Sequence, residues 1–282
     1  LEHGQWLTKH YLGSAGRPAM AAMAEDLASA KSALITALTK THLPRPYNVS
    51  DTRLETCAKF LQPYHNVFTL NYDLLLYWAC MASEELTRRD GFRDSEDDPD
   101  AEYCVFAEHV GGNPGIFFVH GALHLFISGG EVRKHTWSKS GKPLIESIQA
   151  ALEESQYPLF VAEGLAVKKK EQIEASSYLS YCLGKLSRIQ GPLVVFGWGM
   201  GESDRHILDC IAHNVKLPTL YVGLHGDPKS AENECIKKSV AALIERRRSA
   251  VARHLRGSEL EVSFFDSSTS PVWEPLSGSK KR

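Results

Sequence analysis

The chain alternates short apolar runs with longer segments of helical periodicity, and this alternation constrains its fold more than any other feature. Each run has three or four residues, mostly β-branched, leucine or aromatic. The runs lie at 67–70, 116–119, 159–161, 193–196, 220–222 and 262–265. Unbroken apolar strands of this kind are typical of parallel sheets that helices cover on both faces. We therefore predict an α/β fold: a three-layer, Rossmann-like, mainly parallel sheet with helices on both faces.

Segments with apolar residues at three-to-four spacing supply the helices between these strands. They are predicted at 73–88, 143–155, 168–189, 203–214 and 231–256. Two further helices are predicted at 18–40, where Pro18 occupies the first turn, and at 51–61, where Ser50 or Asp51 offers a cap. The acidic stretch 90–100 predicts a solvated loop, and 122–137 predicts a hairpin insertion.

These elements divide the chain into three parts. Residues 1–62 form a small helical N-terminal segment that belongs to the same domain and is expected to be truncated upstream, because Leu1 stands where an initiator Met is expected. Residues 63–266 form the Rossmann-type domain, and residues 267–282 are predicted to be a disordered tail.

Composition argues against several classes of partner. With 32 Lys and Arg against 34 Asp and Glu, the net charge of −2 provides no basic field to attract nucleic acid or anionic lipid. No window approaches the roughly 20 apolar residues of a membrane-spanning helix. The six cysteines form no C-x-x-C pair, which indicates reduced intracellular thiols. We expect a cytoplasmic protein with no nucleic-acid or membrane partner, and leave self-association open.

Candidate ligand-binding residues follow the predicted strands, because ligands bind outside the carboxyl ends of an open parallel sheet. The candidates are Thr69, Asn71 and Asp73 after the first strand, His120 and Gly121 after the second, Glu163 after the third, and Gly197, Gly199, Gly201, Ser203 and Asp204 after the fourth. The glycine-rich segment leads into a helix, which is the context in which backbone N–H groups approach phosphate or ribose. Glu202 stands where the dinucleotide fingerprint requires glycine.

Each candidate also has a structural interpretation. Asp73 is placed to cap a helix by accepting from the N–H of Leu75 or Leu76. His120 after an apolar run is typical of a satisfied core histidine, although Gly121 allows a ligand or another backbone to approach closely. His120 and His124 have metal-ligand spacing, but four strand residues span about 13 Å, so no metal is expected.

Several motifs together resemble the sirtuin-like superfamily. They are T-x-N-x-D at 69–73, the His-Gly pair at 120–121 and GWGMGESDRHI at 197–207, in that order. The phrases FTLNYDLLLYW, FVHGALHLF, PLFVAEG and VVFGWGMGESDRHIL are most similar to a bacterial family of sirtuin-like domains of unknown function. The likeness covers about residues 50–265. Two features of the superfamily are absent, namely the glycine-rich loop that would precede Thr69 and the zinc-binding cysteine module of deacylases.

The resemblance implies that the chain binds NAD as a substrate and hydrolyses it to nicotinamide and ADP-ribose, as such domains do in bacterial antiphage defence. It places the catalytic roles on Asn71 and His120 and the nucleotide on the strand-end residues given above. Its chemistry is plausible, because nicotinamide leaves as a neutral group. Asn71 can orient the attacking water and His120 can accept its proton.

Two alternatives come from other classes of protein. One is a non-catalytic sensor of a nucleotide or ADP-ribose, which keeps the pocket without turnover. The other is an interaction domain that uses the basic residues Arg246, Arg247, Arg248, Arg253 and Arg256 to bind an acidic partner. For that stretch, a solvated helix face is the simpler interpretation.

Overall fold

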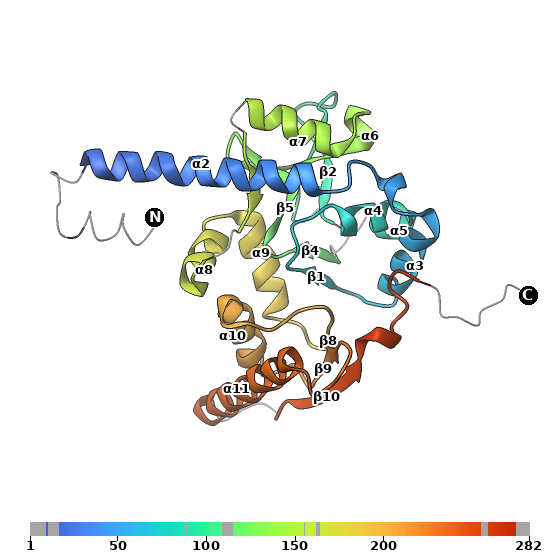
Figure 1. Cartoon of the computed structure of the whole chain (residues 1–282), viewed down its shortest axis with the longest axis vertical. Helices are drawn as coiled ribbons and strands as arrows, with labels where there is room; N and C mark the ends of the chain where they lie inside the picture. Colours follow the sequence, from blue (N-terminus) through green and yellow to red (C-terminus); the bar gives the residue numbers. More distant parts are fainter. Residues whose placement is uncertain are drawn as a thin grey trace, which may run out of the picture.

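The computed structural model describes residues 10, 17–87, 90–108, 115–154, 156–161, 164–254 and 259–274. It is an α/β structure in which the described strands form three small sheets, surrounded by helices (Figure 1). No helix of the described ranges is long and apolar enough to cross a membrane.

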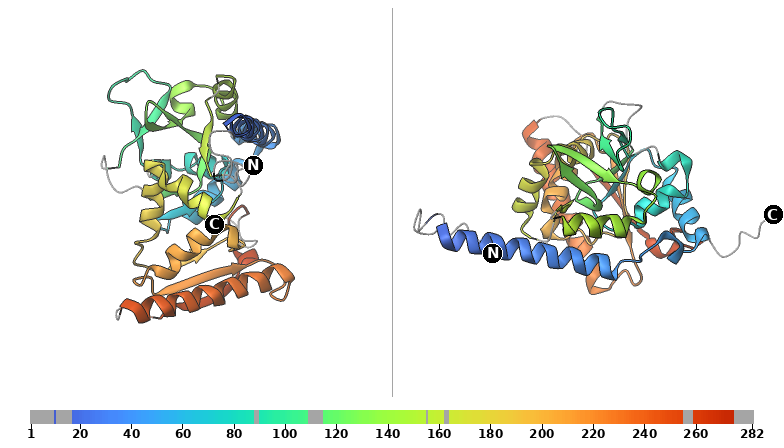
Figure 2. Two further views of the ribbon diagram at one scale, coloured as in Figure 1. Left: turned by 90° about the vertical axis from the view of Figure 1, so that its left-hand side faces the viewer. Right: turned by 90° about the horizontal axis from the view of Figure 1, so that it is seen from above.

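The N-terminal helices agree with the prediction. Helix α2 (Arg17–Thr41) lies along α7 and extends beyond the rest of the molecule, as Figure 1 and the right-hand view of Figure 2 show. After the short 3-10 turn η2 (Pro46–Asn48), helix α3 (Asp51–Leu61) begins at the Ser50 cap, whose hydroxyl accepts from the Arg53 N–H at 3.4 Å.

Two of the sheets are parallel, as predicted. Strand β1 (Val67–Thr69) pairs with β4 (Ile116–Phe118). A second sheet has the order β10-β9-β8 and is also parallel, with β8 at Leu193–Val195, β9 at Thr219–Leu224 and β10 at Glu261–Asp266. Among the described residues, β1 and β8 each pair along one edge only.

The largest sheet is antiparallel, which differs from the predicted single, mainly parallel sheet. Its order is β2-β3-β6-β5-β7, with β2 at Phe92–Asp94, β3 at Tyr103–Phe106, β5 at Gly121–Ser128, β6 at Glu131–His135 and β7 at Pro158–Phe160. The predicted hairpin is present, because Gly129 and Gly130 take positive φ and turn the chain tightly. The acidic stretch, which was predicted to be a loop, contains β2. The run at 159–161 pairs antiparallel with β5. The prediction of a parallel strand there was wrong because apolar composition does not encode strand direction.

The remaining helices surround these sheets. They are α4 (Leu75–Met81), α5 (Glu84–Thr87), α6 (Trp137–Ser140), α7 (Leu144–Glu153), α8 (Ala166–Glu174), α9 (Ser177–Leu186), η3 (Glu202–Asp204), α10 (Arg205–His213), α11 (Ala231–His254) and η4 (Ser267–Thr269). The predicted helix at 168–189 is divided into α8 and α9 at Ser176, whose hydroxyl caps α9. Contrary to the predicted disordered tail, Ser267 and Val272 are buried, whereas 275–282 lie outside the described residues.

The basic stretch of α11 is not a fully solvated face. Arg247 is 1% exposed and donates to the carbonyls of Ala212, Asn214 and Leu217, at the end of α10 and the turn after it. Arg246 pairs with Glu202 and Asp209, and Arg248 with Glu245, while the side chains of Arg253 and Arg256 lie outside the described part. Arg247 thus joins α11 to α10.

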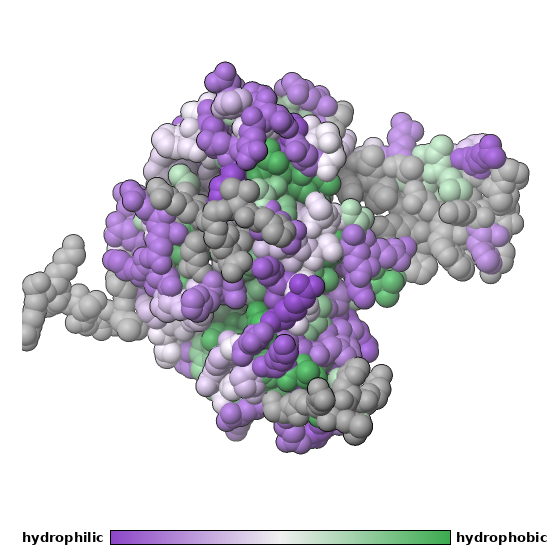
Figure 3. All heavy atoms as spheres, turned by 180° about the vertical axis from the view of Figure 1, so that it is seen from behind, coloured by the Kyte–Doolittle hydropathy of each residue, from purple (hydrophilic) through white to green (hydrophobic). Residues whose placement is uncertain are grey.

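Burial of the cysteines agrees with reduced thiols in the core. Cys57, Cys80, Cys104 and Cys182 are buried, and burial raises the pKa of Cys57 to about 11 and that of Cys182 to about 12. Cys235 is the exposed exception. Elsewhere the surface is mixed: apolar side chains emerge in separate places among hydrophilic ones on the face shown in Figure 3.

His124 is a buried polar side chain in β5 with neither ring nitrogen hydrogen-bonded. Its ring lies 5.0 Å from the rings of Tyr77 and Phe118, and burial lowers its pKa well below the ordinary value. A buried unpaired imidazole costs free energy that an apolar ring does not. We expect His124→Phe to raise the free energy of unfolding by about 1 kcal/mol, measured by urea denaturation. A lower free energy of unfolding in His124→Phe would show that the imidazole makes a polar interaction in the folded protein.

Candidate functional site

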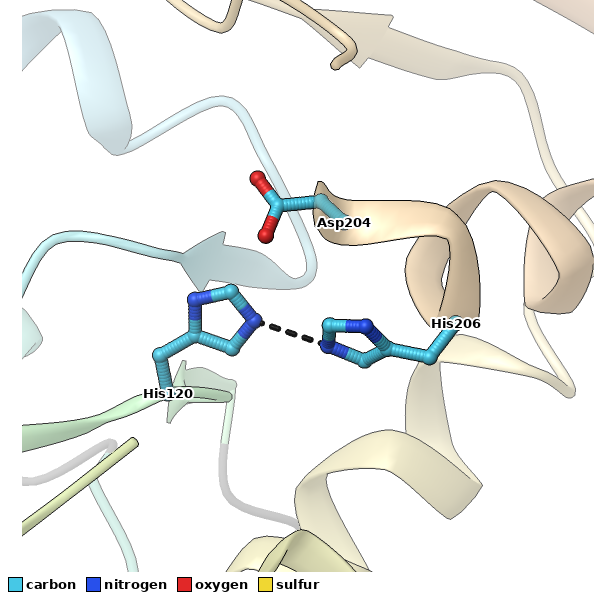
Figure 4. A group of neighbouring side chains, drawn as sticks. All are labelled: His120, Asp204 and His206. Carbon is cyan, nitrogen blue, oxygen red and sulfur yellow. Dashed lines mark hydrogen bonds between the residues drawn. The ribbon is translucent and has the colours of Figure 1, made fainter. Parts of the chain in front are cut away.

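The carboxyl end of β4 and the start of α10 meet at a cluster of three side chains. His120 lies two residues after the end of β4, Asp204 ends η3, and His206 lies in the first turn of α10 (Figure 4). His120 and His206 are 4% and 5% exposed, so both imidazoles are shielded from solvent. These residues are 86 positions apart in sequence and come together because their elements converge at one end of the parallel strands.

The hydrogen bonds of the two histidines fix their tautomers. His120 Nε2 lies 3.0 Å from His206 Nε2, and the His120 ring also bonds to the backbone of Leu70. The Leu70 bond raises the pKa of His120, so the ring donates to the Leu70 carbonyl. The proton of neutral His120 then belongs on Nδ1, and its Nε2 accepts from His206 Nε2. His206 Nδ1 then carries a lone pair, and this buried atom has no hydrogen-bond partner.

Burial keeps both imidazoles neutral. It lowers the pKa of His120 to about 4; Asp204 opposes that effect, while His206 and Lys169 reinforce it. Burial also lowers the pKa of His206. At neutral pH the pair therefore carries no charge.

Asp204 is held in the cluster by two donors. Lys169 Nζ lies 2.9 Å from one carboxylate oxygen, and Trp198 Nε1 donates to the other at 3.0 Å. Burial alone would raise the pKa of Asp204, but these hydrogen bonds and the Lys169 charge lower it. The carboxylate therefore stays ionised beside the histidines. Lys169 is 5% exposed, so its ammonium depends on this partner.

His120, Asp204 and His206 could in principle hold a metal ion, since one ligand atom from each lies within 4.8 Å of the others. The charges argue against it. Both Asp204 oxygens already accept hydrogen bonds, and the Lys169 ammonium at 2.9 Å would repel a cation. We therefore describe the cluster as a hydrogen-bonded group. His124 lies in the core and is not part of it.

A second set of predicted residues lies in a neighbouring cavity of about 360 Å³ between β1 and β8. Thr69, Asn71, Asp73 and Gly197 line it, whereas His120 does not. The register of β1 and β4 nevertheless aligns Thr69 with Phe118, so Asn71 and His120 follow at corresponding positions. The structure thus brings these two residues to one end of the sheet, but of the two only Asn71 lines the cavity.

Local structure explains several of the predicted residues. Asp73 Oδ1 accepts from the Leu75 N–H at 2.8 Å, which confirms its capping role, and Thr69 Oγ1 accepts from the Asn71 N–H at 3.1 Å. At Gly121, φ is +76°, and an added Cβ would lie 2.1 Å from the Leu159 carbonyl oxygen. The glycine therefore admits the neighbouring β7 backbone.

The glycine-rich segment after β8 is an exposed turn. Gly197, Gly199, Gly201 and Ser203 are exposed, and η3 follows directly. Gly197 has a φ of +66°, so the first position favours glycine for its backbone. Glu163 lies outside the described residues.

His206 and the two donors to Asp204, namely Lys169 and Trp198, were not assigned roles from the sequence. His206 follows Asp204 by two positions at the start of a predicted helix, and that position on the strand-to-helix turn is the signal that could have identified it. Lys169 stands in a run of three lysines, which predicts a solvated face. Trp198 lies within the glycine-rich segment, whose predicted ligand contacts come from backbone N–H groups and not from side chains.

Fold and site together define an α/β protein with a buried, neutral histidine pair at the carboxyl end of its parallel strands. Over residues 17–273 the chain matches the family model described as Domain of unknown function (DUF4917), and it belongs to that family. No curated protein matches the chain significantly.

The buried histidines predict acid lability. The unfolded chain takes up a proton near pH 6.5, whereas folded His120 resists it until about pH 4. Its contribution to stability is therefore complete above pH 6.5 and is lost as pH falls through this window, by about 1.4 kcal/mol per pH unit. We expect His120→Gln to lose less stability than the wild type between pH 7 and pH 5, measured by urea denaturation. Equal losses would contradict the assignment.

Proposed function

We propose that this protein binds NAD at the carboxyl ends of β1, β4 and β8 and hydrolyses it to nicotinamide and ADP-ribose, as a cytoplasmic sirtuin-like enzyme of antiphage defence. The proposal includes a three-layer Rossmann-like arrangement of the parallel strands. The observation that carries it is the buried His120 in a fixed tautomer, one strand away from Asn71. A site at this edge is where α/β sheets bind nucleotides.

The reaction breaks the bond between ribose C1′ and the nicotinamide nitrogen, and water forms the new bond to C1′. Nicotinamide keeps the bonding electrons and leaves as a neutral molecule, so the water releases one proton. In the proposal the exposed Asn71 amide orients this water, and His120 Nε2 accepts the proton. Because His206 occupies that atom with its N–H, the substrate must displace the hydrogen bond between the two rings. Asp204 then stabilises the protonated imidazole.

Nicotinamide release in the presence of NAD tests the proposal. We expect Asn71→Ala to lower turnover about 100-fold, because the water loses its orienting group. The exposed Asn48→Ala in η2 is the matched control and should keep wild-type turnover. A chelator should leave the rate unchanged, since no step uses a metal. If turnover in Asn71→Ala decreases by less than about threefold, Asn71 does not orient the water and serves only in the turn after β1.

A non-catalytic nucleotide sensor is the second candidate function. The observation that favours it is that His120 is 4% exposed and does not line the cavity that Asn71 enters. Titration calorimetry with ADP-ribose distinguishes the two functions. Binding without NAD loss under any condition would support the sensor.

A further inference from the structure

Lys169 is the inward-facing member of a run of three lysines on α8. The side chains of Lys168 and Lys170 are 45% and 56% exposed and pair with glutamates of the same helix, whereas Lys169 is buried. Lys169 and Ile173 are the buried residues of this helix, and a spacing of four places both on one face. The chain therefore puts an ammonium group on a helix face where an apolar side chain would avoid the cost of burying a charge.

The partner of this ammonium is Asp204 in η3, 35 positions further along the chain. Removing one member of a buried ion pair leaves an uncompensated charge, but replacing both members by apolar residues of similar volume is often neutral or stabilising. Stability alone therefore does not explain why the chain carries both charges here. The neighbours of the carboxylate indicate another role, because the rings of His120 and His206 lie beside it.

Asp204 lies next to the two imidazoles without a hydrogen bond to either. One of its oxygens and one nitrogen of each ring lie within 4.8 Å of one another, yet the only hydrogen bond among the three side chains in Figure 4 joins the two rings. The carboxylate oxygens accept instead from Lys169 at 2.9 Å and from Trp198 at 3.0 Å. A carboxylate so close to an imidazole would, with a free oxygen, bond to the protonated ring and stabilise its charge.

The charges that act on the two imidazoles come from three elements packed around them. They are Asp204 on η3, Asp209 on α10, and Lys169 and Lys170 on α8. The carboxylates favour a protonated ring, whereas the ammonium groups and burial disfavour it. Of the four, only Asp204 and Lys169 act on His120 directly, and these two are bonded to each other. The balance at His120 therefore depends on one ion pair.

We propose that Lys169 is a positioning residue which, together with Trp198, holds the Asp204 carboxylate away from the histidine pair and so leaves His120 free to accept a proton. Without Lys169, a carboxylate oxygen becomes available to the imidazoles and holds a proton on the pair before any substrate arrives. His120 could then not take the proton of the attacking water. The role of Lys169 in turnover rests on the proposed function, whereas the protonation of His120 is a property of the protein without substrate.

NMR of the imidazole nitrogens in the ¹⁵N-labelled full chain, titrated from pH 8 to pH 5 without substrate, tests the inference. With a pKa of about 4, His120 of the wild type is only about one tenth protonated at pH 5. We expect Lys169→Met to raise this pKa by at least about 1, so that about half or more of His120 is protonated at pH 5. Lys168→Met, the matched control, removes a partly exposed ammonium of the same helix and should leave His120 unchanged.

Two further variants test whether Lys169 acts through the carboxylate. Trp198→Phe removes the other donor to Asp204 without a change of charge, and should also raise the pKa of His120. In the double variant Lys169→Met, Asp204→Asn, which buries no unpaired charge, His120 should titrate as in the wild type. The inference is overturned if His120 stays as neutral at pH 5 in folded Lys169→Met as in the wild type, or if the double variant keeps the raised pKa. If Lys169→Met does not fold, an unchanged pKa in folded Trp198→Phe overturns it.

Turnover separates this inference from the proposed function. In an NAD-hydrolysing protein, Lys169→Met should move the acid limb of the pH profile of kcat/KM to higher pH by the same amount as the pKa of His120, because the base must be unprotonated to act. A raised pKa of His120 in a protein that does not consume NAD would support the inference and contradict only the proposed function. Lower activity in Lys169→Met with an unchanged pKa of His120 would overturn the inference and leave the proposed function in place.

Discussion

Replacing His120 with alanine is expected to lower the rate of NAD hydrolysis about 1,000-fold, with the protein still folded. The variant removes the proposed proton acceptor and leaves Asn71 and the cavity between β1 and β8 in place. It also leaves His206 Nε2 without an acceptor at 3.0 Å. The loss should appear in kcat and much less in KM, because the imidazole acts on the departing proton and not on the bound nucleotide.

Two further variants separate catalysis from folding. His213→Ala removes an exposed histidine of the same helix as His206 and should keep full activity. His206→Gln keeps a donor for His120 Nε2, so it should lower the free energy of unfolding less than His206→Ala. Urea denaturation of each variant verifies that the chain remains folded. Unchanged turnover in a folded His120→Ala protein would refute the catalytic role.

The sequence predicts those residues of the candidate site that follow a predicted strand. His120, Asn71 and Asp204 follow apolar runs, and the edge rule for parallel sheets brings them to one end of the molecule. Lys169 could not be found this way, because its burial depends on a carboxylate 35 positions further along the chain. Side-chain pairing across such a distance has no local signal in composition or periodicity.

The fold was predictable where local chemistry determines it. The Ser50 cap, the capping role of Asp73 and the Gly129-Gly130 turn are all short-range features, and the structure has all three. Strand direction was not predictable in the same way. The run that contains β7 is as apolar as β8, yet β7 pairs antiparallel with β5. Gly121 permits the close approach of the β7 backbone, but neither this glycine nor the apolar run encodes the direction of the strand.

The antiparallel sheet contains a buried ion pair between Lys134 on β6 and Asp90 just before β2. Both side chains are largely buried, at 8% and 11% exposure, and Asp90 also accepts from the Phe92 N–H at 3.0 Å. Burial disfavours the Lys134 ammonium, but the Asp90 charge and hydrogen bond outweigh it and raise the pKa of Lys134. The lysine is therefore charged in the core, over the rings of Tyr77 and Phe92.

Removing the carboxylate should be among the most destabilising single changes in the protein. We expect Asp90→Ala to lower the free energy of unfolding by about 3–5 kcal/mol, because it leaves the Lys134 ammonium buried without a partner. The matched control is Asp94→Ala on the same sheet. Asp94 pairs with Lys139, and its side chain is 68% exposed. That change should cost about 0–1 kcal/mol. Urea denaturation at pH 7 measures both. Equal effects would mean that water reaches Lys134 and that the sheet opens around it.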